Sequence, residues 1–433
     1  MNPELRRNLW LELSTHRLIA MPVVGGAGGL LCQCVESGGS LTLGDAEAAS
    51  SVADAALVAY GLIVVLWGGR LAAGAVVEEI RDRTWDDQKL TAIGPWAMTV
   101  GKLFGSTVYT WYGGLIALAV FALARSGHES LESIMTSAVT YLAVGVLCQA
   151  AGLLFSLLSV HGHAVGRRLN VTFFQLAGLG AVVLVYGVVG VFDEGLFERW
   201  HGVHVTLAIF AVNSTVAFAL WAVLGVYRVM RAELQLAGRP WAWPLFCFFL
   251  GLYIVGLPDT WGRAGQDTTV VRMAVFAVVI FALNYVGILF QSKDVVGFRR
   301  MLGALRAADS GAALENLPLW MITYGLALAS ALAVAIAIAQ TADVGRDIQL
   351  TFVAAAVLFL TRDIALLLSL HLGRVSRRAN LAAVVYWLVL YGLVPMLLKV
   401  FDGDAALPVF LPVPWADPLI AILPVFLQAA AMA

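Results

Sequence analysis

Long apolar runs separated by short charged segments recur along the whole of this 433-residue chain. The hydrocarbon core of a bilayer is about 30 Å thick, and a helix needs about 20 mostly apolar residues to cross it. About twelve runs reach or approach that length, which predicts an all-α integral membrane protein. The runs lie at roughly residues 18–35, 53–77, 97–124, 134–160, 171–192, 204–227, 242–257, 270–290, 319–340, 348–371, 381–400 and 417–432. The seventh and twelfth are short for a span, so ten or eleven crossings also fit the pattern.

The composition excludes a water-soluble domain and gives no sign of a nucleic-acid partner. Hydrophobic residues make up 61% of the chain, charged residues make up 13%, and the mean hydropathy is +0.86. Soluble domains carry about a quarter charged residues. The net charge of −1 leaves no basic excess. The four cysteines lie in apolar stretches without the spacing of a metal site, so we expect no metal in this chain. The composition therefore predicts that most of the protein surface contacts the lipid bilayer.

The distribution of basic residues predicts the orientation. Lys and Arg accumulate in cytoplasmic segments. With the N-terminus inside, 19 of the 27 Lys and Arg residues fall on the cytoplasmic side, six fall on the opposite side, and two lie within spans. We therefore expect both termini to be cytoplasmic, with the N-terminal segment forming a cytoplasmic amphipathic helix that leads into the first span; the family resemblance described below implies that this helix, over residues 2–15, lies on the membrane surface.

Two short motifs occur twice, which indicates an internal duplication. Residues 159–170 read SVHGHAVGRRLN and residues 369–380 read SLHLGRVSRRAN, with six identities displaced by 210 positions. WAMTVG at 96–101 and WMITYG at 320–325 match with a displacement of 224. We expect two six-helix halves, 1–235 and 236–433, in parallel orientation because six is even, with a transport pathway where they meet. The repeated cytoplasmic motif contributes candidate residues that anchor helix ends at anionic headgroups or contact a partner: His161, Arg167, Arg168, His371, Arg377 and Arg378.

The most informative segment lies between the second and third spans and reads VVEEIRDRTWDDQKLTAIGPWAMTVGKLFG, residues 76–105. Its mixed charges predict a short polar helix bracketed by two apolar ones. A polar helix joined rigidly to two spans is a lever, and its mixed charges suit a protein groove better than a lipid surface. The candidate contact residues in this segment are Glu78, Glu79, Arg81, Arg83, Thr84, Asp86 and Leu90.

This segment resembles the permease subunits of ABC exporters of the type-2 class. The resemblance is carried by an ordered set of features, namely Glu79, Arg83, Thr84, Leu90, Pro95, Gly101 and Lys102. Arg83 stands where the family usually has Gly. The resemblance implies that the short helix is a coupling helix seated in a groove of a separate ATPase subunit, in the inner membrane of a bacterium.

Two fused halves imply a complete transmembrane pair for two ATPase copies, with ATP and Mg²⁺ bound on that partner. We expect no cofactor and no enzyme activity in this chain, because GPWAMTVGKL lacks the spacing of a phosphate loop. In the second half, Arg299 and Arg300 occupy the corresponding segment, which has no clear Glu-to-Thr pattern. We expect its coupling contact to be altered or weak.

Arg70, Arg362 and Asp363 are charged residues that lie inside apolar runs. Such residues are costly in a membrane unless they are paired or face a cavity. Arg362 and Asp363 are adjacent, so they point about 100° apart on a helix and are not expected simply to cancel each other, and one of them is expected to pair across helices. They either line a pathway or fix the two halves together, or they form a buried structural pair. Asn213 and Asn284 are expected to bond between helices.

Three classes of function remain to be compared. An ABC exporter permease is the first choice. A proton- or ion-coupled secondary transporter, such as the major facilitator superfamily, shares twelve helices, cytoplasmic termini and a two-fold repeat, but Asp363 is almost alone as a proton carrier at membrane depth. An integral membrane enzyme or assembly factor ranks last, because the sequence places no nucleophile, metal cluster or carboxylate pair at membrane depth.

Overall fold

The computed structural model describes residues 3–12, 16, 18–19, 21, 46–91, 93–161, 170–193, 199–236, 238–257, 268–291, 295–341, 345–372, 379–413 and 417–432. These residues are helical almost throughout, and their strands form one two-stranded hairpin, β1 (Arg199–Trp200) with β2 (Val203–His204). The chain divides into two compact units. Unit 1 comprises Met1–Arg199 and Val203–Gly238, and unit 2 comprises Trp200–Gly202 and Arg239–Ala433.

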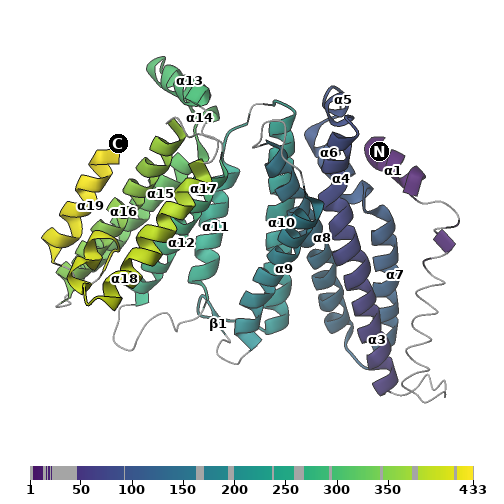
Figure 1. Ribbon diagram of the computed structural model, residues 1–433. Helices are drawn as coiled ribbons and strands as arrows, with labels where there is room; N and C mark the ends of the chain where they lie inside the picture. Colours follow the sequence, from purple (N-terminus) through teal and green to yellow (C-terminus); the bar gives the residue numbers. More distant parts are fainter. Residues whose placement is uncertain are drawn as a thin grey trace. The chain divides into compact units, whose positions relative to one another are not determined.

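Unit 1 is a bundle around α8 (Figure 1). Its helices are α1 (Pro3–Glu12), α3 (Ala46–Tyr60), η1 (Gly61–Gly68), α4 (Gly69–Arg81), α5 (Trp85–Lys89), α6 (Pro95–Val100), η2 (Gly101–Gly105), α7 (Val108–Arg125), α8 (Leu131–His161), α9 (Val171–Asp193) and α10 (Leu207–Glu233). The long helix α8 packs against α4, α9 and α10, and α3 packs against α7. The segments η1 and η2 are π-helical.

Unit 2 is a second helical bundle. Its helices are α11 (Ala242–Val255), α12 (Thr268–Phe290), α13 (Val295–Arg306), α14 (Ser310–Glu315), α15 (Leu319–Gln340), α16 (Arg346–Leu372), α17 (Ala379–Leu388), η5 (Val389–Leu393), α18 (Val394–Val400), η6 (Asp404–Val409) and α19 (Pro418–Met432). Here α12 packs against α11 and α15, and α16 packs against α15, α17 and α19.

Within the described ranges, nine helical segments are long and apolar enough to cross a membrane. They are Ala49–Arg81, Val108–Arg125, Leu131–Val160, Val171–Gly190, Leu207–Glu233, Thr269–Leu289, Leu319–Gln340, Arg346–His371 and Ala379–Val400. Ala242–Val255 and Pro418–Met432 are shorter apolar helices. The chain is therefore an all-α, membrane-embedded protein. The expected first span, 18–35, lies almost wholly outside the described residues, and the count of twelve and the duplication stay predictions.

The expected span 97–124 is wrong as a single helix, because it is interrupted at Ser106 and Thr107 between η2 and α7. Both hydroxyls bond to carbonyls four residues earlier, Ser106 Oγ to the Lys102 oxygen at 2.6 Å and Thr107 Oγ1 to the Leu103 oxygen at 2.7 Å. Such bonds compete with the helix ladder. The apolar run therefore continues through a break that its composition does not reveal.

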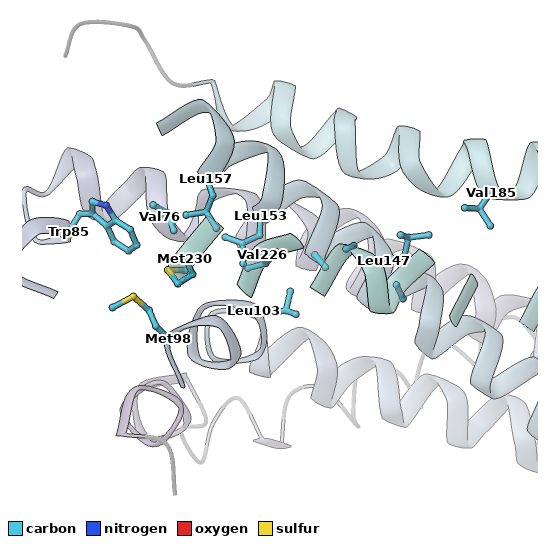
Figure 2. Packing of buried hydrophobic residues seen from close by; sticks show 13 residues of the cluster. Val76, Trp85, Met98, Leu103, Leu147, Leu153, Leu157, Val185, Val226 and Met230 are labelled. Atoms are coloured by element: carbon cyan, nitrogen blue, oxygen red, sulfur yellow. The ribbon is translucent and has the colours of Figure 1, made fainter. Parts of the chain in front are cut away.

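A buried cluster fills the centre of unit 1 and reaches the end of α4 (Figure 2). Leu147, Leu153 and Leu157 of α8 pack with Val226 and Met230 of α10, and the cluster extends to Trp85 and Met98. In a bilayer, lipid contact is as apolar as helix contact, so close van der Waals packing holds helices together. The short helix α5 is thereby fixed to the same core as three long helices.

Candidate functional site

The end of α4 is closed by a Schellman motif with an arginine at its left-handed position. The amide of Thr84 bonds to the Glu79 oxygen at 2.9 Å, and the amide of Arg83 bonds to the Ile80 oxygen at 3.2 Å. Arg83 has φ 60°, a conformation that favours Gly because it brings the side-chain Cβ close to the backbone. This geometry gives a physical reason for a glycine at this position, and Arg83 holds it with strain.

Trp85 anchors α5 to unit 1. Its side chain is 4% exposed and packs in the buried cluster with Met98 and Leu103. The ammonium of Lys102 lies 5.9 Å from the centre of the Trp85 ring, and that of Lys89 lies 5.8 Å from it. Cations over an indole face are attracted by the ring quadrupole. The five-residue helix is therefore held by one buried aromatic side chain with two cations beside it.

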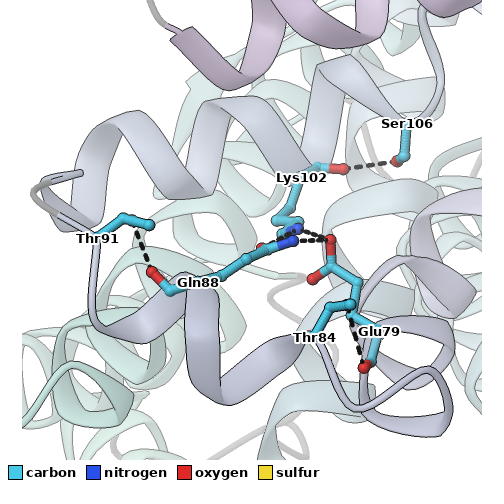
Figure 3. Close-up of polar contacts among 6 residues, drawn as sticks. All are labelled: Glu79, Thr84, Gln88, Thr91, Lys102 and Ser106. Atoms are coloured by element: carbon cyan, nitrogen blue, oxygen red, sulfur yellow. Dashed lines mark hydrogen bonds and ion pairs between the residues drawn. The ribbon is translucent and has the colours of Figure 1, made fainter.

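A buried polar network joins α4, α5 and η2 (Figure 3). Lys102 Nζ forms an ion pair with Glu79 Oε1 and donates to Gln88 Oε1 at 2.7 Å, while Gln88 Nε2 donates to Glu79 Oε1 at 2.6 Å. The Lys102 side chain is 3% exposed and that of Glu79 is 16% exposed. A buried ammonium is tolerated when it is paired and hydrogen-bonded. The network therefore ties the three elements into one rigid corner.

The opposite side of α5 is solvent-exposed and carries two acids and one leucine. Asp86, Asp87 and Leu90 are all exposed, and the Leu90 side chain is 86% exposed. Lys89 pairs with Asp86 at 2.8 Å and lies 3.8 Å from a carboxylate oxygen of Glu233 on α10. We call Asp86, Asp87 and Leu90 the α5 outer face. An acidic surface with one protruding apolar side chain suits a protein groove with a basic rim.

The predicted residues of this segment separate into inner and outer sets. Glu79 points inward to Lys102. The other predicted residues of the segment, Glu78, Arg81, Arg83, Thr84, Asp86 and Leu90, are exposed. Gln88 and Trp85 were not predicted as site residues, although both hold the corner together. A signal for them existed: a lone lysine in an apolar run, Lys102, requires buried partners.

The corresponding segment of unit 2 is built differently. Arg299 and Arg300 lie exposed on α13, a twelve-residue helix that packs on α14. With the 224-residue displacement of the WAMTVG match, the residue equivalent to Lys102 is Leu326. If the predicted duplication holds, an apolar residue of unit 2 stands where unit 1 has the buried cation of its corner.

The expectation that Arg362 and Asp363 do not pair with each other is wrong. Arg362 Nη2 and Nε lie 2.9 Å and 3.0 Å from Asp363 Oδ1. The long side chain of Arg362 bends along α16, so that its guanidinium reaches the Asp363 carboxylate although the two Cβ atoms point in different directions. Asp363 Oδ2 accepts from Tyr285 at 2.8 Å and from Tyr391 at 2.5 Å, and Arg362 Nη1 donates to Gln428 at 2.9 Å.

This second network joins four helical elements of unit 2. Tyr285 lies on α12, Tyr391 on η5 and Gln428 on α19, and all three bond to the Arg362–Asp363 pair of α16. Arg362 is 1% exposed, and its guanidinium lies 4.6 Å from the centre of the Phe359 ring. Both oxygens of Asp363 receive two donors each, so the carboxylate is well compensated as an anion. The geometry is that of a buried structural contact.

The remaining predicted residues are separate from both networks. Arg70 is exposed on α4, and its Nη1 lies 3.4 Å from the Thr172 hydroxyl. His371 lies near the end of α16 with Nδ1 2.9 Å from the Leu367 oxygen. His161 is the last residue of α8. Arg167, Arg168, Arg377 and Arg378 lie outside the described residues. Asn284 bonds across to α15 as expected, at 3.0 Å to both the Trp320 oxygen and the Thr323 hydroxyl.

Comparisons of this chain with protein-family models, with curated proteins and with solved structures give no match.

Proposed function

We propose that this chain is the transmembrane permease subunit of an ATP-driven ABC transporter, an exporter energised by a separate ATPase subunit. The observation that carries the proposal is the corner formed by α4, α5 and η2. There the buried contacts of Glu79, Gln88 and Lys102 hold a short polar helix rigidly between two apolar helices. The same helix presents Asp86, Asp87 and Leu90 outward. A transmembrane helix pair needs such a corner to receive force from a protein outside the membrane.

The contacts of the corner pass a displacement of α5 on to the neighbouring helices. A partner that moves α5 moves the end of α4 through the Schellman turn and moves η2 through the Lys102 ion pair. Trp85 transmits the same displacement to α8 and α10 through the buried cluster. Packed cores respond to such displacements by switching between arrangements rather than by deforming gradually. The corner thus couples a small movement outside the membrane to the whole of unit 1.

The proposed transporter requires a separate ATPase partner. We propose that the chain binds two copies of an ATPase subunit. These subunits bind ATP and Mg²⁺, and their closing and opening are linked to ATP hydrolysis. Both termini of this chain lie on the same side of a bacterial inner membrane as the ATPase. The α5 outer face is acidic, so the groove that receives it is expected to be basic at its rim. Hydrolysis belongs to the partner, and this chain contributes the pathway and the lever.

Ion-coupled secondary transport is the second candidate, because Asp363 is fully buried within a span of unit 2. A proton carrier must lose its compensating donors during the cycle. Asp363 instead holds Arg362, Tyr285 and Tyr391 together. This arrangement favours a structural role and ranks ion coupling second.

The test is affinity purification of the tagged full chain in mild detergent, with mass spectrometry and an ATPase assay of what is recovered. Leu90→Glu changes the α5 outer face and leaves the buried network intact. Glu132→Arg is the matched control, because it changes an exposed residue at the opposite end of α8. We expect an ATPase subunit with the unchanged chain and with the control, and its loss with Leu90→Glu.

Two results contradict the proposal. One is a well-folded chain that purifies without an ATPase. The other is ATPase recovery that is unaffected by Leu90→Glu. In either case, the deciding assay for the second candidate is proton-dependent uptake by vesicles that contain the Asp363→Asn variant, compared with vesicles that contain the unchanged chain.

A further inference from the structure

The helix α13 has two chemically different sides. Its sequence is VVGFRRMLGALR. With 3.6 residues per turn, Phe298, Leu302 and Leu305 fall on one side, at spacings of four and three residues. Arg299 and Arg306 lie together along one edge of that row, about 80–90° around the helix from its centre, and Arg300 lies on the opposite side. This is the pattern of an amphipathic helix with a basic polar face.

The apolar side of α13 is uncovered by the described chain. Phe298, Leu302 and Leu305 are exposed, and the Leu305 side chain is 57% exposed. Among the large apolar side chains of α13 whose burial the structure describes, Met301 is buried and the others are exposed, and the helix packs on α14. A row of three exposed large apolar side chains on one helix marks a surface that binds something.

The charge of α13 is of one sign. The helix contains Arg299, Arg300 and Arg306 and no acidic residue. No ion pair from these three arginines to another described residue is present. Each arginine near an anionic membrane surface gains attraction, and the apolar side chains beside it gain burial among acyl chains. The two contributions act on the same helix in the same orientation.

The position of α13 in the chain keeps it close to a membrane surface. It follows the span of α12 after a short connection and precedes the span of α15, with α14 between (Figure 1). We propose that α13 lies in the headgroup layer of the anionic leaflet at this end of unit 2, with Phe298, Leu302 and Leu305 inserted among the acyl chains. The inference rests on the membrane-embedded fold and does not require an ATPase partner.

A lipid surface fits α13 better than a partner groove does, by comparison with α5. The α5 outer face is acidic, and its helix is held by a buried tryptophan and a buried ion pair. The α13 surface is basic. Its one buried large apolar side chain among the described ones is Met301, and the helix on which α13 packs, α14, has only six residues. A lever needs firm attachment, whereas an interfacial helix is held by the bilayer itself. The two units therefore use their corresponding segments for different purposes.

The test measures the depth of two positions on opposite sides of α13 in the full chain. Leu305→Cys places a fluorescent label on the apolar side. Gly303→Cys, about 200° around the helix, is the matched control, and a side chain there meets nothing within 4 Å. Both are made in a chain whose four native cysteines are replaced by alanine. The protein is reconstituted into phosphatidylcholine vesicles with and without phosphatidylglycerol, and quenching by spin-labelled lipid and by aqueous iodide is compared.

We expect lipid quenching at position 305 and iodide quenching at position 303 in vesicles that contain phosphatidylglycerol. Changing Arg299 or Arg306 to Gln should lower the ratio of docked to free helix by about fivefold per charge. Iodide quenching at position 305 in both kinds of vesicle overturns the proposal. So does protection of position 305 that arises only after an ATPase partner is added. Neither result depends on whether α5 binds an ATPase.

Discussion

Lys102, with its buried ammonium group, is the residue on which the corner of unit 1 most depends. Lys102→Met removes the charge and leaves the Glu79 carboxylate buried without its counter-ion, which costs about 3–5 kcal/mol. We expect a large drop in the thermal unfolding midpoint of the detergent-purified chain. The measurement is the loss of the monodisperse species on size-exclusion chromatography after heating.

A double-mutant cycle separates this pairing from simple packing loss. Glu79→Gln with Lys102→Met removes both charges, so the doubly changed chain should be more stable than the chain with Lys102→Met alone. Losses that simply add would show that Glu79 and Lys102 do not interact.

Arg83 stores strain at the turn that follows α4. Its φ of 60° costs an ordinary residue about 1–2 kcal/mol, and Gly adopts it freely. Arg83→Gly should therefore raise the thermal midpoint, by a net effect of about 1 kcal/mol after the added freedom of the unfolded chain is subtracted.

Arg83→Ala is the matched control for that change. It removes the same charge and keeps a Cβ in the left-handed conformation, so no gain is expected. An equal gain in both variants would assign the effect to the guanidinium rather than to the backbone.

Individual charges in apolar runs were located by the sequence, but their partners were not. Composition alone identified Arg362 and Asp363 as buried groups that need compensation. Their pairing along α16 depends on how a flexible guanidinium curls, and Tyr285, Tyr391 and Gln428 come from distant parts of the chain. Likewise, Glu79 was selected, whereas Gln88 was not: the lone Lys102 indicates that buried partners exist, but the sequence of a polar helix does not show which of its side chains turns inward.

The contact between α8 and α9 depends on one glycine. A Cβ on Gly178 would lie 2.5 Å from the Cys148 carbonyl oxygen and 3.0 Å from the Gly152 nitrogen. Gly178→Ala therefore forces the two helices apart, at a cost of about 1–3 kcal/mol. Gly180, two residues along the same helix, has nothing within 4 Å of an added Cβ.

Gly180→Ala serves as the control and should leave the thermal midpoint unchanged or slightly raised, because alanine favours helix. The comparison is made by heating both variants in the same detergent. Equal behaviour of the two variants would show that α8 and α9 do not approach closely at Gly178.

Apolar runs predict where the helices lie but not how their ladders are interrupted. Hydropathy follows side-chain composition, and in the described part of the chain eight predicted runs coincide with helices of spanning length, while a ninth, 97–124, coincides with one only over Val108–Arg125. The π-helical turn η1 was not predicted, because it depends on tertiary contacts. There the Val64 oxygen accepts from Gln149 at 3.0 Å and the Leu66 oxygen accepts from Gln175 at 3.0 Å. Both donors lie more than eighty positions away.

Across the whole molecule, the two units are unequal at the segments that connect their second and third helices in the proposed repeat. Unit 1 has a buried ion pair, an anchored α5 and an acidic outer face. Unit 2 has Leu326 in place of the lysine and the basic helix α13. If both proposals hold, one unit receives force from the partner while the other is held by lipid, so the transport cycle is asymmetric.

The orientation of the two units in the membrane gives the last prediction. If the halves are parallel with cytoplasmic termini, Gly94 and Gly303 face the cytoplasm, whereas Gly127 and Gly345 face outward. Each is replaced by Cys in a chain without native cysteines, since none of the four has a crowded Cβ position. A membrane-impermeant maleimide applied to intact cells should label positions 127 and 345 and should reach 94 and 303 only after the cells are broken. Reversal of the unit 2 pair alone would make the halves antiparallel. Reversal of both pairs would place the termini outside, which would remove α5 from any ATPase in the cytoplasm.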